Sequence, residues 1–266
     1  MKKYLLITLF IITLLLAGYS YFIEPNKLEV TNYTIQDKEL SGVKIVFASD
    51  FHIKPYGQKR LEKVVETINA QNPDVVISAG DFVCGHTEHS TMHPQKIAEG
   101  LAKVKSKYGF YTTLGNHDGW YDRWYIKELL EKQNIKVLNN KNEKLQINGK
   151  EIFIAGVEDM MTAFPNMEDA LKGTKTPTIL LTHTPDVFPD IPRNVNLTLA
   201  GHTHGGQVRL PLLGALIVPS DYGNKYSSGL IEEKGKKMIV TNGIGVSILP
   251  IRFNCPPEVI VIEFVK

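Results

Sequence analysis

The sequence predicts an α/β fold in which two β-sheets form a sandwich flanked by helices, preceded by a transmembrane helix at the N-terminus. Three observations lead to this prediction. An uncharged apolar run lies near the start of the chain, short β-branched runs then alternate with segments of helical spacing, and a strong hairpin signal follows later. Alternation of strands and helices predicts a largely parallel sheet covered by helices, and the hairpin predicts a second, more antiparallel sheet.

Length and composition limit the possible classes of protein. With 266 residues, 43% hydrophobic and 22% charged, the chain can form one domain with a sizeable core, although two small domains would also fit. The net charge is +2 and neither sign forms a long block, so nucleic acid is not an expected partner. Cys84 and Cys255 exclude a disulfide framework and a cysteine-rich zinc site, but leave a single bridge open.

Residues 1–24 are expected to form a membrane anchor. Lys2 and Lys3 precede an uncharged run from Tyr4 to Ile23, which has the length of about 20 residues that crosses a bilayer. A cleaved signal peptide and a buried core helix are the alternatives. The lysine pair weakly favours a cytoplasmic N-terminus, and therefore a single-pass protein whose domain lies outside the cytoplasm.

The remaining chain is expected to contain one folded domain. Residues 25–41 are assigned to a linker and a first strand region, because Glu24-Pro25-Asn26 ends the helix. The domain is assigned to residues 42–266, since no repeat, low-complexity tract or second linker follows residue 42. The sequence indicates no oligomeric state.

Five short runs in this domain resemble strands, and each ends in polar side chains. They are 43–49 before Asp50 and His52, 75–80 before Asp81, 110–115 before Asn116, His117 and Asp118, 178–182 before His183, and 197–201 before His202 and His204. Helical spacing at 61–68 and 126–130 indicates β-α-β units. Sites in open α/β sheets lie beyond the carboxyl ends of the strands, so the five clusters are expected to converge on one sheet edge.

The second sheet is predicted from later segments. Asn148-Gly149 separates two apolar runs, 145–147 and 152–155, and is a strong signal for a two-residue hairpin. The runs 238–241 and 259–265 have the composition of further strands. We assign these segments to the second sheet.

The polar side chains at the strand ends suit divalent metal ions. Asp, His and Asn without Cys are typical ligands of Mn²⁺, Fe²⁺ or Zn²⁺. The candidates are Asp50, His52, Asp81, Asn116, His183, His202 and His204. Seven ligands are too many for one ion but fit two ions about 3.5–4 Å apart, with Asp81 as the natural bridge. Such a pair binds phosphate oxygens and lowers the pKa of a bridging water, which predicts hydrolysis of a phosphate ester by hydroxide.

Each of these residues, taken alone, is more often a structural hydrogen-bonding group than a ligand. The glycines favour the functional interpretation. Gly80, Gly115 and Gly201 each stand immediately before a cluster, where the chain must turn tightly and let its backbone approach a ligand.

Taken in order, these motifs resemble the signature of the calcineurin-like metallophosphoesterases over roughly residues 42–266. The matching motifs are Asp50-Phe51-His52, Gly80-Asp81, Gly115-Asn116-His117-Asp118, His183 and Gly201-His202-Thr203-His204. The resemblance implies two ions, the first held by Asp50, His52, Asp81 and His204 and the second by Asp81, Asn116, His183 and His202. It also implies that His117 binds no metal but faces the phosphate as a charge-stabilising group or proton donor, oriented by Asp118. A purely supporting role is the alternative for His117.

The stretch 199–211 is similar to a bacterial membrane-associated branch of this family, which includes phosphodiesterases and UDP-diacylglucosamine pyrophosphatases. The resemblance implies hydrolysis of a phosphate diester or pyrophosphate bond in a lipid-linked or cell-envelope substrate. A tethered phosphatase of soluble substrates and a metal-binding scaffold without turnover are the alternatives. Cys84 departs from the pattern, because many relatives carry an acidic or amide residue there.

Two groups of side chains near the motifs are candidates for substrate contacts. The first, which could clamp a second phosphate or be surface charges and packing tyrosines, comprises Arg209, Tyr222, Lys225, Tyr226 and Arg252. The second, which could form an apolar lip or pack in the core, comprises Trp120, Tyr121, Trp124 and Tyr125.

Overall fold

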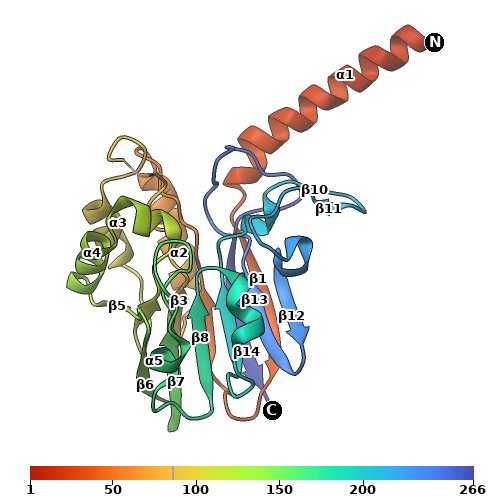
Figure 1. The fold of residues 1–266 in the computed structure, drawn as a ribbon. Helices are drawn as coiled ribbons and strands as arrows, with labels where there is room; N and C mark the ends of the chain where they lie inside the picture. The colour runs from red at the N-terminus through yellow and green to blue at the C-terminus, as the bar shows by residue number, and fades with distance from the viewer. Residues whose placement is uncertain (86) are drawn as a thin grey trace.

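The computed structural model describes residues 1–85 and 87–266, which form two six-stranded sheets, a set of covering helices and one projecting N-terminal helix (Figure 1). This arrangement confirms the predicted α/β class, the two sheets and the flanking helices. The first sheet has the strand order β1-β14-β2-β3-β4-β5 and the second β12-β13-β9-β8-β7-β6.

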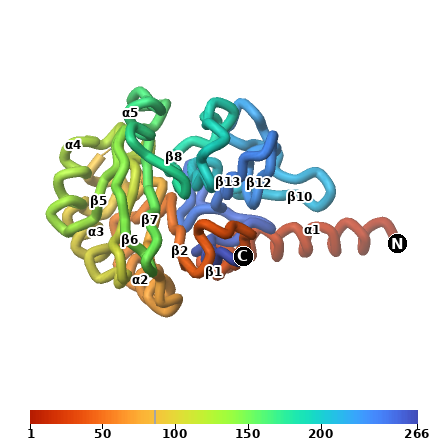
Figure 2. Tube along the Cα trace, turned by 90° about the horizontal axis from the view of Figure 1, so that it is seen from below, coloured from red at the N-terminus to blue at the C-terminus, as the bar shows by residue number. Residues whose placement is uncertain are grey.

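The first sheet is mostly parallel. Its strands are β1 (Glu29–Gln36), β2 (Lys44–Phe47), β3 (Val75–Ser78), β4 (Phe110–Thr112), β5 (Ile135–Val137) and β14 (Glu258–Val265). Among them β14 and β2 pair antiparallel, and the other neighbours pair parallel. The helices beside this sheet are α2 (Gln58–Ala70), α3 (Pro94–Leu101) and α4 (Asn116–Lys132) (Figures 1 and 2).

The second sheet has a parallel centre and a hairpin at each edge. Its strands are β6 (Lys141–Ile147), β7 (Lys150–Gly156), β8 (Thr178–Thr182), β9 (Leu197–Ala200), β12 (Gly229–Glu233) and β13 (Lys236–Val240). The pairs β6/β7 and β12/β13 are antiparallel. The pairs β7/β8, β8/β9 and β9/β13 are parallel. The predicted hairpin turn is confirmed, since Asn148 and Gly149 both have positive φ, 51° and 78°.

Smaller elements complete the fold. They are α5 (Met167–Leu171), the short strands β10 (Arg209–Leu210) and β11 (Gly214–Ala215), and the 3₁₀ turns η3 (Pro185–Asp190), η4 (His204–Gly206) and η5 (Gly223–Tyr226). The two short strands pair with each other as a hairpin.

The central strands are buried on both faces, which explains their nearly continuous apolar sequences. Ile45 and Phe47 of β2 belong to the core between the two sheets, whereas Val46 packs in the core beneath the helices. The helical spacing in α2 is confirmed, because Leu61 and Val64 pack in that second core together with Val65 and Ile68.

Two sequence assignments were wrong. The five ligand-bearing strands do not share one sheet edge, since β2, β3 and β4 lie in the first sheet and β8 and β9 in the second. Strand β14, which covers 259–265, lies in the first sheet between β1 and β2. A run of buried apolar residues marks a central strand but carries no signal for which of two packed sheets it joins.

The N-terminal helix α1 (Lys2–Gly18) continues through a π-helical turn, η1 (Tyr19–Ile23), and a 3₁₀ turn, η2 (Glu24–Asn26). The stretch is long and apolar enough to cross a membrane, with a mean hydropathy of 2.2 over a window of which none is buried. It projects from the body of the protein in both views (Figures 1 and 2). Its end is fastened to the domain, since Ser20 O accepts a hydrogen bond from Arg252 N at 2.9 Å.

Candidate metal centre

The polar side chains that follow five strands meet at one end of the sandwich. Asp50 and His52 follow β2, Asp81 follows β3, and Asn116 begins α4 directly after β4. His183 follows β8 and His202 follows β9, so that the two sheets contribute to the same cluster. The parallel strands of both sheets therefore end at one place, although they do not form one sheet.

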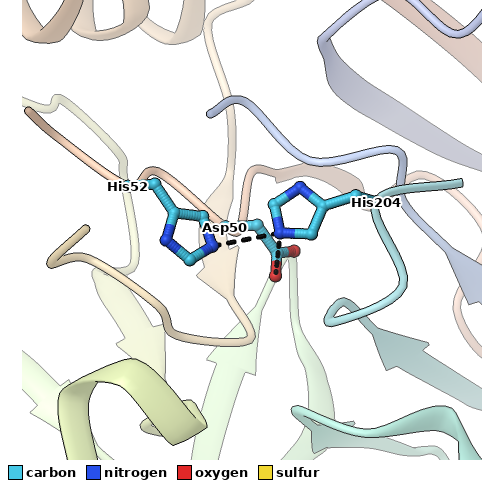
Figure 3. A group of neighbouring side chains, drawn as sticks. All are labelled: Asp50, His52 and His204. Atoms are coloured by element: carbon cyan, nitrogen blue, oxygen red, sulfur yellow. Dashed lines mark hydrogen bonds and ion pairs between the residues drawn. The ribbon is translucent and has the colours of Figure 1, made fainter. Parts of the chain in front are cut away.

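The first part of the cluster consists of Asp50, His52 and His204 (Figure 3). His52 Nε2 lies 3.0 Å from His204 Nε2, which lies 3.8 Å from Asp50 Oδ1. All three side chains are buried. Asp50 Oδ2 has no hydrogen-bond partner among the described residues, and a buried carboxylate oxygen left in this state is costly unless a cation satisfies it.

The second part of the cluster consists of Asn116, His183 and His202. Asn116 Oδ1 lies 2.8 Å from His183 Nε2 and 2.9 Å from His202 Nδ1. The other ring nitrogen of His183, Nδ1, lies 2.8 Å from the carbonyl oxygen of Ala79. A hydrogen bond of this kind fixes the tautomer of a metal-binding histidine and directs its other nitrogen into the site.

Asp81 lies between the two parts. Its Oδ2 is 3.3 Å from His52 Nε2 and 3.4 Å from His183 Nε2, so that one oxygen faces a histidine of each part. Its Oδ1 accepts a hydrogen bond from the backbone N–H of His117 at 2.8 Å. This is the position that a bridging carboxylate requires.

Burial and mutual charge set the protonation of the cluster. Burial lowers the pKa of His183, but the charge and hydrogen bond of Asp81 outweigh it and raise that pKa to about 10. Burial and the charge of His183 lower the pKa of His202 to about 3. Burial and neighbouring His52 lower the pKa of His204. His202 and His204 therefore present neutral rings, the form in which imidazole binds a metal.

The two central carboxyl groups shift in opposite directions. Burial raises the pKa of Asp50. For Asp81 burial also acts upward, but the charges and hydrogen bonds of His183 and His52 outweigh it and hold the pKa well below its usual range. The group that bridges the two parts therefore carries its charge.

The backbone at the cluster is strained. Five of the seven candidate ligands have left-handed conformations, with φ of 53° for Asp50, 40° for His52, 56° for Asp81, 71° for His202 and 51° for His204. Non-glycine residues adopt this region at a cost of about 1–3 kcal/mol each, and such residues gather at functional sites. The strained residues lie where the chain turns after each strand and directs the candidate ligand toward the centre.

Gly115 gives the site its close packing, as its place before a ligand cluster predicts. A Cβ added at Gly115 would lie 2.1 Å from Asp81 Oδ1 and 2.6 Å from His183 Cε1. Gly80 packs against the Gly115 backbone, and a Cβ there would lie 2.2 Å from Gly115 N. Any larger side chain would displace the central carboxylate.

Asp118 is fully buried and braces the backbone around the site. Its Oδ2 accepts hydrogen bonds from Asp81 N at 2.7 Å and Gly115 N at 3.0 Å. Its Oδ1 accepts from Phe82 N at 2.9 Å and from Val83 N at 3.3 Å. Burial and the Asp81 charge raise its pKa to about 7, against the effect of these N–H donors. These contacts differ from the orienting role that the family resemblance implies for Asp118.

His117 lies at the half-buried edge of the cluster. Its Nδ1 lies 2.9 Å from the carbonyl oxygen of Cys84, and its ring packs edge-on against His52 with centroids 4.5 Å apart. A nitrogen of His117 also falls within 4.8 Å of ligand atoms of His52 and Asp81. The geometry therefore places His117 beside the centre, in contact with a predicted ligand.

The arrangement fits divalent cations. The donor atoms are oxygen and imidazole nitrogen without thiolate, three groups of them converge within 4.8 Å, and Asp50 Oδ2 is unsatisfied among residues 1–85 and 87–266. Asn116 and His202 lie outside these three groups but join the same cluster, since Asn116 Oδ1 lies close to both His183 Nε2 and His202 Nδ1. The division of the ligands between two ions stays a prediction, since Asp50 also forms a group with Asp81 and His183.

The sequence analysis missed the segment that closes the site behind β13. Gly243 is so close that a Cβ there would lie 2.8 Å from Asp50 Cβ, and Gly245 N donates to Asp50 O at 2.7 Å. The signal was present, because Asn242 and these glycines directly follow a strand, as in the other clusters.

Arg252 was considered in the sequence analysis as a possible clamp for substrate. The structure excludes this role. It is fully buried, and its guanidinium donates to backbone carbonyls of Gly245, Cys255 and Asn242. Tyr226 is likewise buried, with its ring against Phe188. Composition cannot distinguish an exposed arginine from one that ties loops together.

The remaining candidates for substrate contacts are divided between surface and core. Arg209 donates to the hydroxyl groups of Ser227 and Ser228, and Lys225 pairs with Glu233 at 2.8 Å. Among the aromatic group, Tyr121 and Tyr125 pack against the core beneath the helices, whereas Trp120 and Trp124 are exposed.

The comparison with protein families shows the family to which the chain belongs. The profile of the calcineurin-like phosphoesterases matches residues 43–206, which contain all seven candidate ligands. The chain belongs to this family. As a metallophosphoesterase it is a hydrolase of phosphoric esters, and the resemblance seen in its motifs is confirmed.

Relatives of this metallophosphoesterase extend over nearly the whole chain. It is 34% identical to the uncharacterized metallophosphoesterase YkuE of Bacillus subtilis, over 92% of this chain and 88% of that protein. It is 28% identical to the phosphodiesterase YaeI of Escherichia coli, over 93% and 92%. The structure of the Haemophilus influenzae NAD nucleotidase NadN shares the fold, with a TM-score of 0.51 and 19% identity over 76% of this chain and 45% of that one.

Proposed function

We propose that this metallophosphoesterase hydrolyses a phosphate diester or pyrophosphate bond in a lipid-linked or cell-envelope substrate, at a site for two divalent ions. The observation that carries the proposal is the position of Asp81, whose single Oδ2 faces His52 at 3.3 Å and His183 at 3.4 Å. One ion is assigned to Asp50, His52, Asp81 and His204, and the other to Asp81, Asn116, His183 and His202. Mn²⁺, Zn²⁺ and Fe²⁺ are the ions that suit these ligands.

Bound divalent ions supply Lewis acidity, which makes water acidic enough to react near neutral pH and neutralises charge on a phosphate. The protein's own contribution is to hold the ligands before any ion arrives. The strained backbone, the glycine packing and the four N–H groups bound by Asp118 each fix the position of Asp81 or its neighbours.

His117 is assigned to the leaving-group side of the reaction. It lies at the half-buried edge of the site, where a substrate phosphate can reach it, and the Cys84 carbonyl holds its Nδ1. A histidine held through one nitrogen can donate a proton from the other to a departing oxygen. Asp118 supports this residue indirectly, through the backbone at the start of α4.

The lipid-linked character of the substrate is inferred from the N-terminal helix and from the exposed aromatic side chains beside the site. We assign residues 1–24 to a membrane anchor, 25–41 to a linker and first strand region, and 42–266 to the catalytic domain. The Lys2-Lys3 pair favours a domain on the outer side of the membrane. Trp120 is 43% exposed and its ring centroid lies 5.3 Å from that of His117, so it can contact an apolar part of the substrate.

The proposal is tested by turnover of bis-p-nitrophenyl phosphate with the full chain in detergent, after chelation and after return of Mn²⁺ or Zn²⁺. We expect activity that depends on the ion and that Asp81→Asn lowers by orders of magnitude. Unchanged turnover in Asp81→Asn would contradict the assignment. Absence of turnover with every ion would favour the non-catalytic scaffold.

The lipid-linked substrate is tested separately by comparing acylated and deacylated forms of a candidate pyrophosphate. Contacts with acyl chains should make kcat/KM fall sharply when the chains are removed. Equal values of kcat/KM for the two forms would instead indicate a tethered enzyme of soluble substrates.

A further inference from the structure

The hairpin of β10 and β11 is an unusual surface feature. Residues 210–219 carry no charged or hydrogen-bonding side chain. Leu212 is fully exposed, and Leu213, Leu216 and Ile217 are between 66% and 80% exposed. Four large aliphatic side chains in one short hairpin are therefore directed into solvent, where soluble proteins rarely place a run of apolar residues.

A second apolar loop lies beside the hairpin. Ile248 is fully exposed and Leu249 is 57% exposed. Gln207, two residues before β10, joins the loops, because its Nε2 donates to Leu249 O at 3.1 Å and its Oε1 accepts from Ser247 N at 2.6 Å. We define the apolar rim as Leu212, Leu213, Leu216, Ile217, Ile248 and Leu249.

The apolar rim lies on the side of the domain from which the N-terminal helix emerges. An apolar groove separates the last turns of α1 and η1 from Val208, Ile251 and Phe253, which flank the two rim loops. The hydrogen bond from Arg252 N to Ser20 O fastens the same loop to the helix end. In both views the β10–β11 hairpin and α1 project from the same side of the body (Figures 1 and 2).

The apolar rim is also rigidly connected to the metal centre. The ligand His204 begins η4, and β10 starts only five residues after it. The hairpin packs directly on η4, because a Cβ added at Gly206 would lie 2.4 Å from Ala215 Cβ and 2.7 Å from Ile217 O. The rim is therefore held at a fixed place relative to the ligand His204.

The composition of the apolar rim favours lipid over a protein partner. All six side chains are Leu or Ile, whereas the residues that dominate protein interfaces are Trp, Tyr and Arg. Aliphatic side chains gain free energy for each CH₂ group moved from water into acyl chains. A membrane-anchoring α1 would hold the rim at high local concentration near the bilayer.

We propose that the apolar rim inserts into the membrane beside the anchor and places the metal centre at the lipid surface, where it meets the phosphate of a membrane lipid headgroup. This inference rests on the proposed anchor and deepens the proposed function, because docking of this kind explains how a lipid-linked phosphate would reach the site without leaving the bilayer.

The test uses the full chain in phosphatidylcholine vesicles, with an environment-sensitive fluorophore on Leu213→Cys in a Cys84→Ser background that leaves the buried Cys255. Matched labels on Leu9→Cys in α1 and on Gln146→Cys, exposed on β6, serve as controls. Spin labels on the acyl chains should quench most of the emission at residues 213 and 9 and little at residue 146. Iodide in the buffer should quench only the label at residue 146.

A label at residue 213 that acyl-chain spin labels do not quench would overturn the proposal, whatever the label at residue 9 shows. Protection of residue 213 from iodide without quenching by lipid would mean that protein, such as a second copy of the chain, covers the rim, and would also overturn it. The labels report position and not turnover. Loss of the proposed enzymatic function is therefore distinguishable from failure of this inference.

Discussion

The role of Asp118 gives a quantitative prediction. In Asp118→Asn the amide can present its oxygen to only one pair of backbone donors, and its NH₂ group must face the other pair. If the NH₂ group faces Asp81 N and Gly115 N, the two hydrogen bonds of 2.7 Å and 3.0 Å that these groups donate to the buried carboxylate are lost. Hydrogen bonds to charged groups contribute about 1.5–3 kcal/mol each, and burial of the charge offsets part of this, so above the Asp118 pKa of about 7 we expect a loss of about 3 kcal/mol in the free energy of unfolding.

For a chain of this size that loss lowers Tm by roughly 6–12 °C, measured by circular dichroism on the metal-free protein. Because the Asp81 backbone loses its brace, affinity for Mn²⁺ should fall as well, measured by titration. The control is Asp122→Asn in the same helix, since exposed Asp122 accepts from Trp124 N and Tyr125 N as a cap. Asn caps as well as Asp does, so its effect should be under about 0.5 kcal/mol.

An Asp118→Asn protein with unchanged Tm and metal affinity, but reduced kcat, would refute this reasoning. That result would mean that Asp118 acts on His117, as the family resemblance implies, and not on the backbone of Asp81 and Gly115.

Three further predictions concern the centre itself. Gly115→Ala should reduce metal affinity and turnover together, because the added Cβ would lie 2.1 Å from Asp81 Oδ1. Metal binding near pH 7 should release a proton, because the pKa of His183 is raised to about 10 and the ion needs the neutral ring. Calorimetry in buffers of different ionisation enthalpy measures this release. The affinity for the ion should therefore rise with pH up to about pH 10. His117→Ala should lower kcat about 10²–10⁴-fold for an alkyl phosphodiester and much less for a p-nitrophenyl ester, with unchanged metal content.

Each of these predictions has a contradicting outcome. Normal metal affinity in Gly115→Ala would show that the glycine is not needed for close packing. A binding enthalpy that is the same in all buffers would mean that His183 carries no proton in the metal-free protein. Loss of an ion in His117→Ala would make His117 a ligand, which its distance to His52 and Asp81 permits.

The sequence predicted which side chains converge better than it predicted the arrangement of the strands that carry them. Asp50, Asp81 and His183 were singled out because a buried strand is short and apolar and ends abruptly in a polar group, which is a local pattern. The partition of their strands between two sheets was missed, because it depends on pairing between distant segments. The strand β14 shows this most clearly, since its partner β1 precedes it by more than 200 residues.

Interactions with the backbone were equally invisible in the sequence. Asp118 belongs to the family motif, yet its four partners are N–H groups, which every residue except proline carries. Arg252 was interpreted as a phosphate clamp or a surface charge for the same reason, although it is buried and donates mainly to carbonyl groups of neighbouring loops. The tertiary fold alone decides which backbone groups need such a partner.

Metal-edge anomalous diffraction from crystals of the Mn²⁺-loaded protein tests the central claim most directly. The account predicts two peaks about 3.5–4 Å apart, one on each side of Asp81 Oδ2, with His52 and His204 at the first and Asn116 and His183 at the second. A single peak, or peaks away from Asp81, would contradict the two-ion site.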